Sequence, residues 1–498
     1  MKIDIVLGII IIFIFFITGC NTSVSQNRLE PYRQQVRQYR LRTTQSTGLN
    51  DLLAMSDDQF DLAHTVLTLC AENNNQIDIK QNLDLIDELA AELALRLDGK
   101  TKPKDKVNTL CDFVWAKGFH APQPFWKDYS AREYFDLWQL NYTDFSRLLN
   151  TRQGNCLSLS ILYLSLAERV GLPLYGVAIP HHIFVRYDDG VERFNLETTH
   201  NGHIYSDKDY IDQYSANPHY TASFYLNNLT KKQVLGCLLL NLGTLYYRHK
   251  DIKTALKFHR MALKTNFNDP SLLYSIGNEY LLLSDLKRAQ TFYKESLLQY
   301  PHNPFIYSQL GYIFWIKKDY PQSLNYLKHA QDILTSQETE RKRMPGESEK
   351  TSFAQTCLAM TRNYMANVYL DMGNAQLALE EAQQALDIWR FKSHVIQYYN
   401  YNSVVDIYRT LGRIYLALDE PDNSIRYYKM ALARLKPSEG NNRKKLEGII
   451  LAELGNTHRK NGSDGKAEKY FDEAGSIFKS LGDANWYLKV MRMKILPE

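Results

Sequence analysis

The stretch Arg152-Gln-Gly-Asn-Cys156-Leu-Ser-Leu-Ser160 begins the segment that decides the fold of the N-terminal half of this chain. Residues 157–170 are apolar on nearly every side, which is the pattern of a helix that is buried all round. Asn155 is a favourable N-cap residue, and Gly171 is a favourable residue for ending the helix. The sequence therefore predicts a buried helix with Cys156 in its first turn.

A cysteine in the first turn of a helix has a chemical advantage. The free backbone N–H groups and the helix dipole favour an anion there, so they stabilise a thiolate, which is the nucleophilic form. The alternative is a core residue, because free cysteine is among the most buried residue types. Cys156 is thus a candidate nucleophile that needs partners.

Two candidate partners follow on predicted strands. Residues 183–187 and 192–197 have strand patterns, and Asp189-Gly190 between them predicts a two-residue type I′ turn. That turn would place His182 directly opposite Glu197, with Cβ atoms roughly 4.5–5.5 Å apart. The alternatives are an ordinary hydrogen-bonded strand histidine and a solvated edge carboxylate.

These residues resemble the transglutaminase-like superfamily, in which a Cys begins a central helix and a His and an acid follow on adjacent strands. The resemblance covers roughly residues 55–225 and implies a papain-like α+β core. It implies that Cys156 is the nucleophile, His182 the general base and Glu197 the orienting acid. His182 fits the family pattern better than His181 does. Glu197 departs from it, because the family usually has Asp.

The resemblance also implies a reaction. Cys156 would attack a peptide or amide carbonyl to form a thioester, with its own backbone N–H contributing to an oxyanion hole. Hydrolysis, deamidation and transamidation would all be open, and no cofactor is implied. Some relatives lack the Cys or the His and look like binding domains, so a non-catalytic scaffold is the alternative function.

A metal site is a weaker possibility. Imidazole suits zinc, and four histidines lie in this region: His181, His182, His200 and His203. No second close pair of ligands accompanies them, so we expect no metal. Trp115, Trp126 and Trp138 either pack in the core or line a substrate groove.

The C-terminal half contains a helical repeat. Gly243, Gly277 and Gly311 are each 34 residues apart, which is the tetratricopeptide period. In every unit a second small residue follows twelve positions after the first: Gly243/Ala255, Gly277/Ala289, Gly311/Ser323, Ala366/Ala378, Gly412/Ser424 and Gly455/Ala467. Small residues allow the two helices of a unit to approach closely.

Such an array presents a concave face, on which we expect a protein or peptide partner. The alternative is that the repeats only pack against the thiol domain. The closest branch of the resembled superfamily is that of bacterial proteins which carry a tetratricopeptide array after the core.

The N-terminus resembles a bacterial lipoprotein signal. A short apolar run, Ile5 to Ile17, precedes Thr18-Gly19-Cys20, and it is shorter than the ~20 residues of a membrane-spanning helix. Cys20 would then be lipidated, anchoring the chain to a membrane in the cell envelope, outside the cytoplasm. The alternative is an uncleaved N-terminal anchor.

The composition excludes some functions. The formal net charge is +4 and no basic run stands out, so we expect no nucleic-acid partner. Five of the six cysteines follow Cys20, an odd number that leaves at least one thiol unpaired.

The predicted fold is an α+β papain/transglutaminase-like domain followed by an all-α tetratricopeptide solenoid. The predicted divisions are a signal peptide (1–20), a polar tether (21–50), the transglutaminase-like domain (51–228), repeat units one to three (229–335), a charged loop (336–352) and units four to six (353–490).

Overall fold

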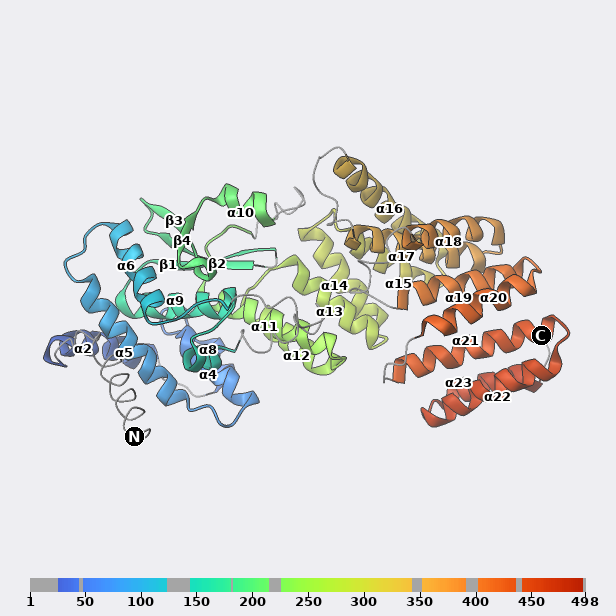
Figure 1. Ribbon diagram of the computed structural model, residues 1–498, viewed down its shortest axis with the longest axis horizontal. Coiled ribbons are helices and arrows are strands. Elements are labelled where there is room, and N and C mark those ends of the chain that lie inside the picture. Colours follow the sequence, from blue (N-terminus) through green and yellow to red (C-terminus); the bar gives the residue numbers. More distant parts are fainter. Residues whose placement is uncertain are drawn as a thin grey trace, which may run out of the picture. The chain divides into compact units, whose positions relative to one another are not determined.

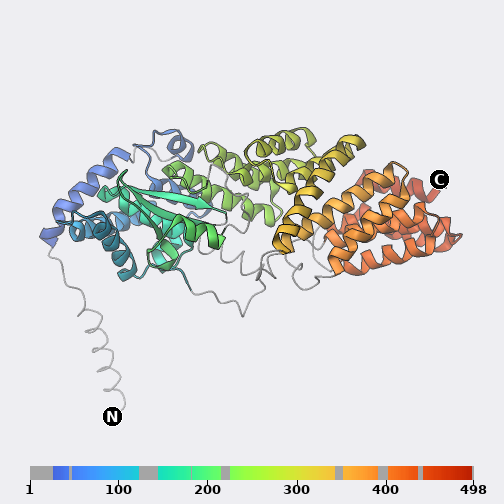
Figure 2. The ribbon, with the colours of Figure 1, turned by 90° about the horizontal axis from the view of Figure 1, so that it is seen from above.

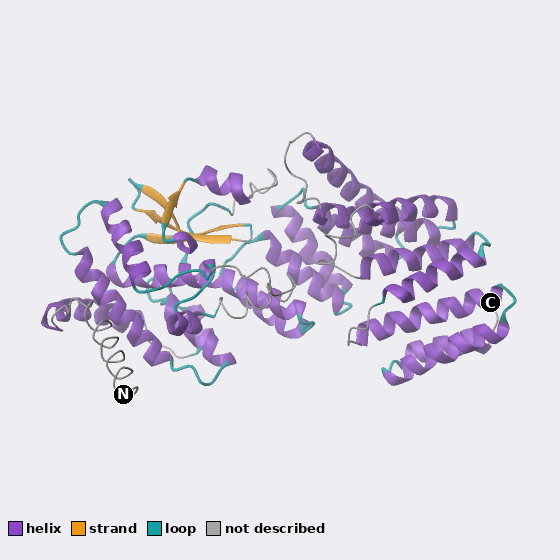
Figure 3. Ribbon diagram, viewed as in Figure 1, coloured by secondary structure: helices purple, strands orange, loops and turns teal. Residues whose placement is uncertain are grey.

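The computed structural model describes residues 26–43, 48–122, 144–180, 182–214, 225–342, 352–390, 402–435 and 441–495. The chain divides into two compact units, Met1–Glu279 and Tyr280–Glu498. Every strand in the described ranges lies in the first unit (Figures 1 and 3). A mixed α+β region thus precedes an all-helical one, as the sequence predicts. The signal segment and Cys20 lie outside the described residues.

The first unit is built around one buried helix, α9 (Cys156–Val170). Asn155 caps it, and Gly171 ends it in the left-handed conformation that glycine adopts without strain. The predicted central helix is therefore confirmed. Helices that contact α9 include α2 (Gln26–Thr43), α4 (Leu62–Asn73), α5 (Ile79–Leu97) and α8 (Phe145–Thr151), whereas α3 (Leu49–Ala54) contacts α4 and α6 (Pro103–Ala116) contacts α5.

A four-stranded antiparallel sheet packs on α9 in the order β1-β2-β3-β4. Its strands are β1 (Leu174–Ile179), β2 (His182–Asp188), β3 (Arg193–Glu197) and β4 (His203–Tyr205), followed by α10 (Asp207–Tyr214). Both strands predicted around the Asp-Gly turn are present, but the predicted register is wrong. Asp188 pairs with Arg193 rather than with residue 191.

The register differs because the loop is longer than a type I′ turn. The Asp189 side chain accepts hydrogen bonds from the N–H groups of Val191 and Glu192, at 2.9 and 2.8 Å, and thereby stabilises a four-residue loop. Gly190 adopts a φ of 84° within this loop. Aspartate side chains stabilise turns in this way, and the two-residue prediction did not include this bond.

Residues 26–43 correct the predicted tether. They form helix α2, which buries Leu29, Val36 and Tyr39 against the rest of the first unit. Arg33 bonds both carboxylate oxygens of Glu88 on α5. The sequence appears polar because α2 packs through ion pairs as well as through apolar side chains.

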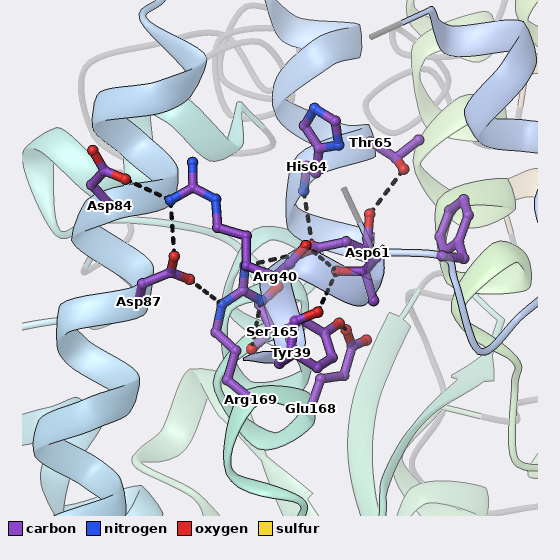
Figure 4. Close-up of polar contacts among 12 residues, drawn as sticks. Tyr39, Arg40, Asp61, His64, Thr65, Asp84, Asp87, Ser165, Glu168 and Arg169 are labelled. Carbon is purple, nitrogen blue, oxygen red and sulfur yellow. Dashed lines mark hydrogen bonds and ion pairs between the residues drawn. The ribbon is translucent and has the colours of Figure 1, made fainter. Parts of the chain in front are cut away.

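A buried ion-pair network links α2, α5 and α9 (Figure 4). Arg169 is fully buried and contacts Asp61 at 2.9 Å and Asp87 at 2.7 Å. Arg40 contacts Asp87 at 3.0 Å. A buried charge is costly without a partner, so Asp61 and Asp87 offset the cost of burying Arg169.

The first helix pair of the repeats belongs to the first unit. Helix α11 (Lys231–Arg248) packs against α4, α9 and β1, and α12 (Ile252–Leu263) packs against α11. Gly176 of β1 makes this approach possible, because a Cβ there would lie 2.5 Å from the side chain of Val234. A β-bridge between Gly176 and Leu229 fixes the start of the array.

The remaining repeats form successive helix pairs that lie side by side within the second unit (Figures 1 and 2). Helix α13 (Pro270–Leu282) spans the division between the units. The later helices are α14 (Leu286–Gln299), α15 (Pro304–Ile316), α16 (Tyr320–Lys342), α17 (Ser352–Asp371), α18 (Ala375–Arg390), α19 (Asn402–Ala417), α20 (Pro421–Arg434), α21 (Asn441–Lys460), α22 (Asp464–Ser480) and α23 (Ala484–Ile495).

The predicted charged loop is partly helical. Helix α16 continues to Lys342, so residues 336–342 are helix, and 343–351 lie outside the described residues. Glutamate, lysine and arginine have high helix propensity, which explains the extension. Across the described ranges, no helix is both long and apolar enough to cross a membrane.

Candidate functional site

The start of α9 holds Cys156 with an unused backbone donor beside it. The Asn155 side chain accepts from the N–H groups of Leu157 and Ser158, both at 3.1 Å, and the Asn155 carbonyl accepts from Leu159 at 3.0 Å. In the described part of the chain, this leaves the N–H of Cys156 as the first-turn donor without a partner. A donor beside a nucleophile is what an oxyanion hole requires.

His182 and Glu197 are in direct contact. The His182 Nε2 lies 2.7 Å from Glu197 Oε2, and both side chains are only 7% exposed. The expected contact is present, although the strand pairing that predicted it is wrong. Continuing the observed register places Glu197 level with Phe184, so it reaches His182 diagonally along the same face of the sheet.

Glu197 accepts several hydrogen bonds at once. Its Oε1 accepts from the backbone N–H of Thr199 at 3.0 Å and from the Thr199 hydroxyl, and its Oε2 also accepts from Tyr210 Oη at 3.1 Å. Burial raises the pKa of Glu197, but the bonds and charge from His182 and the bonds from Thr199 outweigh it, so the pKa is lowered. The acid is therefore ionised and fixed in one orientation.

Cys156 also affects the pKa of His182. Burial lowers the pKa of His182, whereas hydrogen bonds to Cys156 and Glu197 and the charges of both residues raise it, to about 10. Cys156, His182 and Glu197 thus form one hydrogen-bonded series from a thiol to a carboxylate. The structure brings together all three residues that the sequence nominates.

Tyr210 is part of this site and was not predicted from the sequence. Its ring stacks on Phe184 of β2, with centroids 3.8 Å apart, while its hydroxyl bonds Glu197. Tyr210 lies on α10, which begins at Asp207, two residues after the end of β4. No local motif identifies it; only the fold places it beside Glu197.

With this geometry established, comparison with known proteins identifies the domains. The Transglutaminase-like superfamily matches residues 80–239, and the Tetratricopeptide repeat family matches residues 357–436. The chain carries a transglutaminase-like domain followed by tetratricopeptide repeats.

Curated proteins are similar to part of this chain. Two UPF0162 proteins of Buchnera aphidicola, from the subspecies Acyrthosiphon pisum and Schizaphis graminum, are each 30% identical over 126 residues. The match covers 25% of this chain and 47% of each relative, so the chain spans about half the length of the curated relatives it matches.

Solved structures show similarity at a lower level. That of Pseudomonas aeruginosa PilF is 14% identical with a TM-score of 0.34, covering 53% of this chain and 99% of that one. A signal transduction ATPase with a tetratricopeptide repeat sensor from Pyrococcus horikoshii is 15% identical with a TM-score of 0.41. The match covers 87% of this chain and 62% of that one. Scores this low support no argument about function.

The loop that leads into Cys156 in the transglutaminase-like domain is braced from upstream. The N–H of His120 donates to the Arg152 carbonyl at 3.0 Å, and the N–H of Gly154 donates to the His120 carbonyl at 3.2 Å. Trp115 lies edge-on to His120 and is 53% exposed, so it does not pack in the core, the first of the two places considered for it. Trp126 and Trp138 lie outside the described residues.

The other thiols of the described chain differ from Cys156. Cys111, Cys237 and Cys357 are buried and Cys70 is half-buried, and none of the five forms a disulfide. Burial raises the pKa of Cys111 to about 12, and that of Cys357 to about 12 as well. These thiols are protonated at neutral pH, which makes them poor nucleophiles.

Two of the histidines considered as metal ligands, His200 and His203, have other contacts. His200 bonds Tyr205 through Nδ1 at 3.1 Å, and His203 lies opposite Glu197 in the sheet. Among the described residues, no group of three or more His, Cys, Asp and Glu is placed to hold a metal ion. His181 lies outside that part of the chain.

Proposed function

We propose that the transglutaminase-like domain catalyses cysteine-dependent acyl transfer on peptide or amide bonds. The observation that carries this proposal is the continuous series from Cys156 through His182 to Glu197. A histidine pKa near 10 beside a thiol favours the thiolate–imidazolium pair at neutral pH. We expect the protonated imidazole to stabilise a thiolate at Cys156 before any substrate binds.

The proposed reaction has two steps. The Cys156 thiolate attacks the carbonyl carbon, and the developing oxyanion accepts a hydrogen bond from the backbone N–H of Cys156. The His182 imidazolium gives its proton to the departing amine. The result is a thioester and a neutral imidazole. Water or an amine then attacks the thioester, His182 takes the proton, and the thiolate leaves to restore the pair.

Alkylation of Cys156 by iodoacetamide tests this proposal without a known substrate. In the wild-type chain we expect the pH transition of the rate to lie well below the ~8.5 of a free thiol. His182→Ala should move it back toward that value, whereas His249→Ala, at an exposed helix end, should leave it unchanged. Labelling only after unfolding would favour a non-catalytic scaffold instead.

We also propose that the chain is an exported lipoprotein, acylated at Cys20 and held in the cell envelope. The support is the apolar run from Ile5 to Ile17 that precedes Thr18-Gly19-Cys20. Mass spectrometry of the membrane fraction should find an acylated N-terminal Cys20 peptide. Cys20→Ser should remove the acyl group, and an unmodified wild-type Cys20 would contradict the proposal.

We propose that the repeats bind a protein or peptide on the face formed by their first helices. Tyr312 and Trp315 of α15 and Tyr364 of α17 form a half-buried aromatic group there, with Tyr312 and Tyr364 centroids 5.0 Å apart. Aromatic side chains are enriched at protein interfaces. A photo-crosslinker at Tyr312 should capture a partner, whereas one at Leu298, on a second helix, should not.

A further inference from the structure

Helix α2 has one face that the described part of the chain leaves open. Its inner face packs on α5 and α9 through Val36, Tyr39 and the ion pairs of Arg33 and Arg40. Figure 4 shows Tyr39 and Arg40 of this face. Those pairs fix the rotation of the helix about its own axis. These ion pairs therefore determine which side chains of α2 point outward.

The outward face is basic and carries an exposed leucine. Arg28, Arg37 and Arg42 are exposed on it, and Leu41 is 70% exposed. A helical projection at 3.6 residues per turn puts Leu41 in the middle, beside Glu30, Gln34 and Gln38, with Arg37 on one side and Arg42 on the other. Basic side chains close to a membrane are attracted to its anionic headgroups.

Acidic groups do not cancel this charge. Within α2 the single acid is Glu30, which lies 3.5 Å from Arg37 and 3.9 Å from Arg33. At the edge of the face, Asp98 accepts a hydrogen bond from the Tyr32 hydroxyl, and the charge of Arg28 acts on that hydroxyl as well. The exposed arginines therefore keep a net positive charge toward solvent.

The position of α2 in the chain supplies the second observation. It begins at Gln26, only six residues after Cys20 and nine after the end of the apolar run at Ile17. Five intervening residues span at most about 18 Å when fully extended. An anchor at Cys20 would therefore hold the basic face within reach of lipid headgroups.

We infer that the outward face of α2 docks on an anionic membrane surface and so orients the first unit against the bilayer. This inference rests on the proposed anchor. The Arg residues would meet anionic headgroups and Leu41 would enter the interface. The helix would then act as a rigid contact where the sequence alone predicts a loose tether.

A fluorescent reporter at residue 41 tests the docking in the full chain. Leu41→Cys is labelled with an environment-sensitive dye in a Cys156→Ser background, and Val191→Cys, at a position 92% exposed, is the matched control. Both proteins are mixed with vesicles of phosphatidylethanolamine and phosphatidylglycerol, or of phosphatidylcholine alone. A quencher carried on the lipid acyl chains reports insertion of the dye.

We expect quenching at residue 41 in the anionic vesicles, weak quenching in the neutral ones, and none at residue 191. Replacing Arg28, Arg37 and Arg42 by Gln should reduce the docked-to-undocked ratio roughly 100-fold, from about 1 kcal/mol per arginine. Salt near 1 M, where the Debye length is ~3 Å, should have a similar effect.

The outcomes separate the docking from the anchor. A wild-type chain that floats with both kinds of vesicle, with residue 41 unquenched in each, overturns the docking and leaves the anchor standing. A chain that floats with neither overturns both. Flotation with anionic vesicles that the arginine substitutions abolish supports the docking even if Cys20 carries no acyl group.

Discussion

At the residue scale, the unusual acid of the site has a geometric explanation. Glu197 lies level with Phe184 in the sheet and reaches His182 along a diagonal. A diagonal neighbour lies ~7–8 Å away rather than the ~5 Å of a directly opposed pair. The extra methylene of glutamate helps to span that distance, so the departure from the usual Asp suits this register.

Shortening the acid should therefore be harmful even though its charge is kept. We expect Glu197→Asp to lose the bond to His182 and to shift the pH transition of Cys156 alkylation toward that of a free thiol. Glu197→Gln should shift it as well, because the charge that supports the imidazolium is gone. A transition that Glu197→Asp leaves in place would contradict the diagonal geometry.

Tyr210 is expected to position Glu197 rather than to react. Tyr210→Phe keeps the ring stacked on Phe184 and removes only the hydroxyl bond to Glu197. Bonds to charged groups contribute about 1.5–3 kcal/mol, so the free energy of unfolding should fall by about that amount. Urea denaturation measures it, and Tyr205→Phe, whose hydroxyl meets the exposed His200, should cost less.

Because the pKa of His182 is raised, the folded state should lose stability as the pH rises into the alkaline range. Its folded value of about 10 lies above the ~6.5 of an unfolded histidine, so this contribution is complete below ~6.5 and is lost as pH rises toward 10. The difference in urea midpoint between wild type and His182→Gln should therefore shrink as pH rises from neutral to about 10. A difference that grows would contradict the assignment.

At the element scale, glycine positions in the repeats mark close helix approaches. A Cβ on Gly412 would lie 2.7 Å from the Tyr428 ring, and one on Gly311 would lie 2.5 Å from Leu327. In each case the neighbour is sixteen residues further along the chain, on the second helix of the same unit. The small-residue pattern in the sequence therefore reports a real packing constraint.

Two matched substitutions test this constraint. Gly412→Ala should destabilise the fold by about 1–3 kcal/mol, because it forces the Tyr428 ring aside. Gly465→Ala, at a helical position where a Cβ meets nothing within 4 Å, should instead stabilise by up to about 1 kcal/mol. Thermal unfolding distinguishes them, and equal effects would show that packing does not distinguish the two positions.

Local sequence patterns predict the central helix and the strands well, but they predict the pairing between strands and between distant helices less well. Asn155 and Gly171 defined α9 because capping depends on neighbours in sequence. The β2–β3 register was wrong because it depends on side-chain bonds of Asp189 that compete with the simpler turn. Helix α2 was missed because its polar residues find their partners, such as Glu88, far along the chain.

At the scale of the whole molecule, the boundary between thiol domain and repeats is not a simple linker. Helix α11 buries Val234, Leu235 and Leu239 within the first unit. A fragment that ends at residue 228 would expose the surface that these side chains cover. We expect it to aggregate or unfold, whereas one ending at residue 284 should fold; circular dichroism and gel filtration compare them.

The thiols of the described chain bear on how the protein is made. All five are free, and none lies in a disulfide that the fold requires. Among the described residues, an oxidase would have no native bond to form during folding. We therefore expect the polypeptide to reach its native state in a reducing solution, without an oxidant.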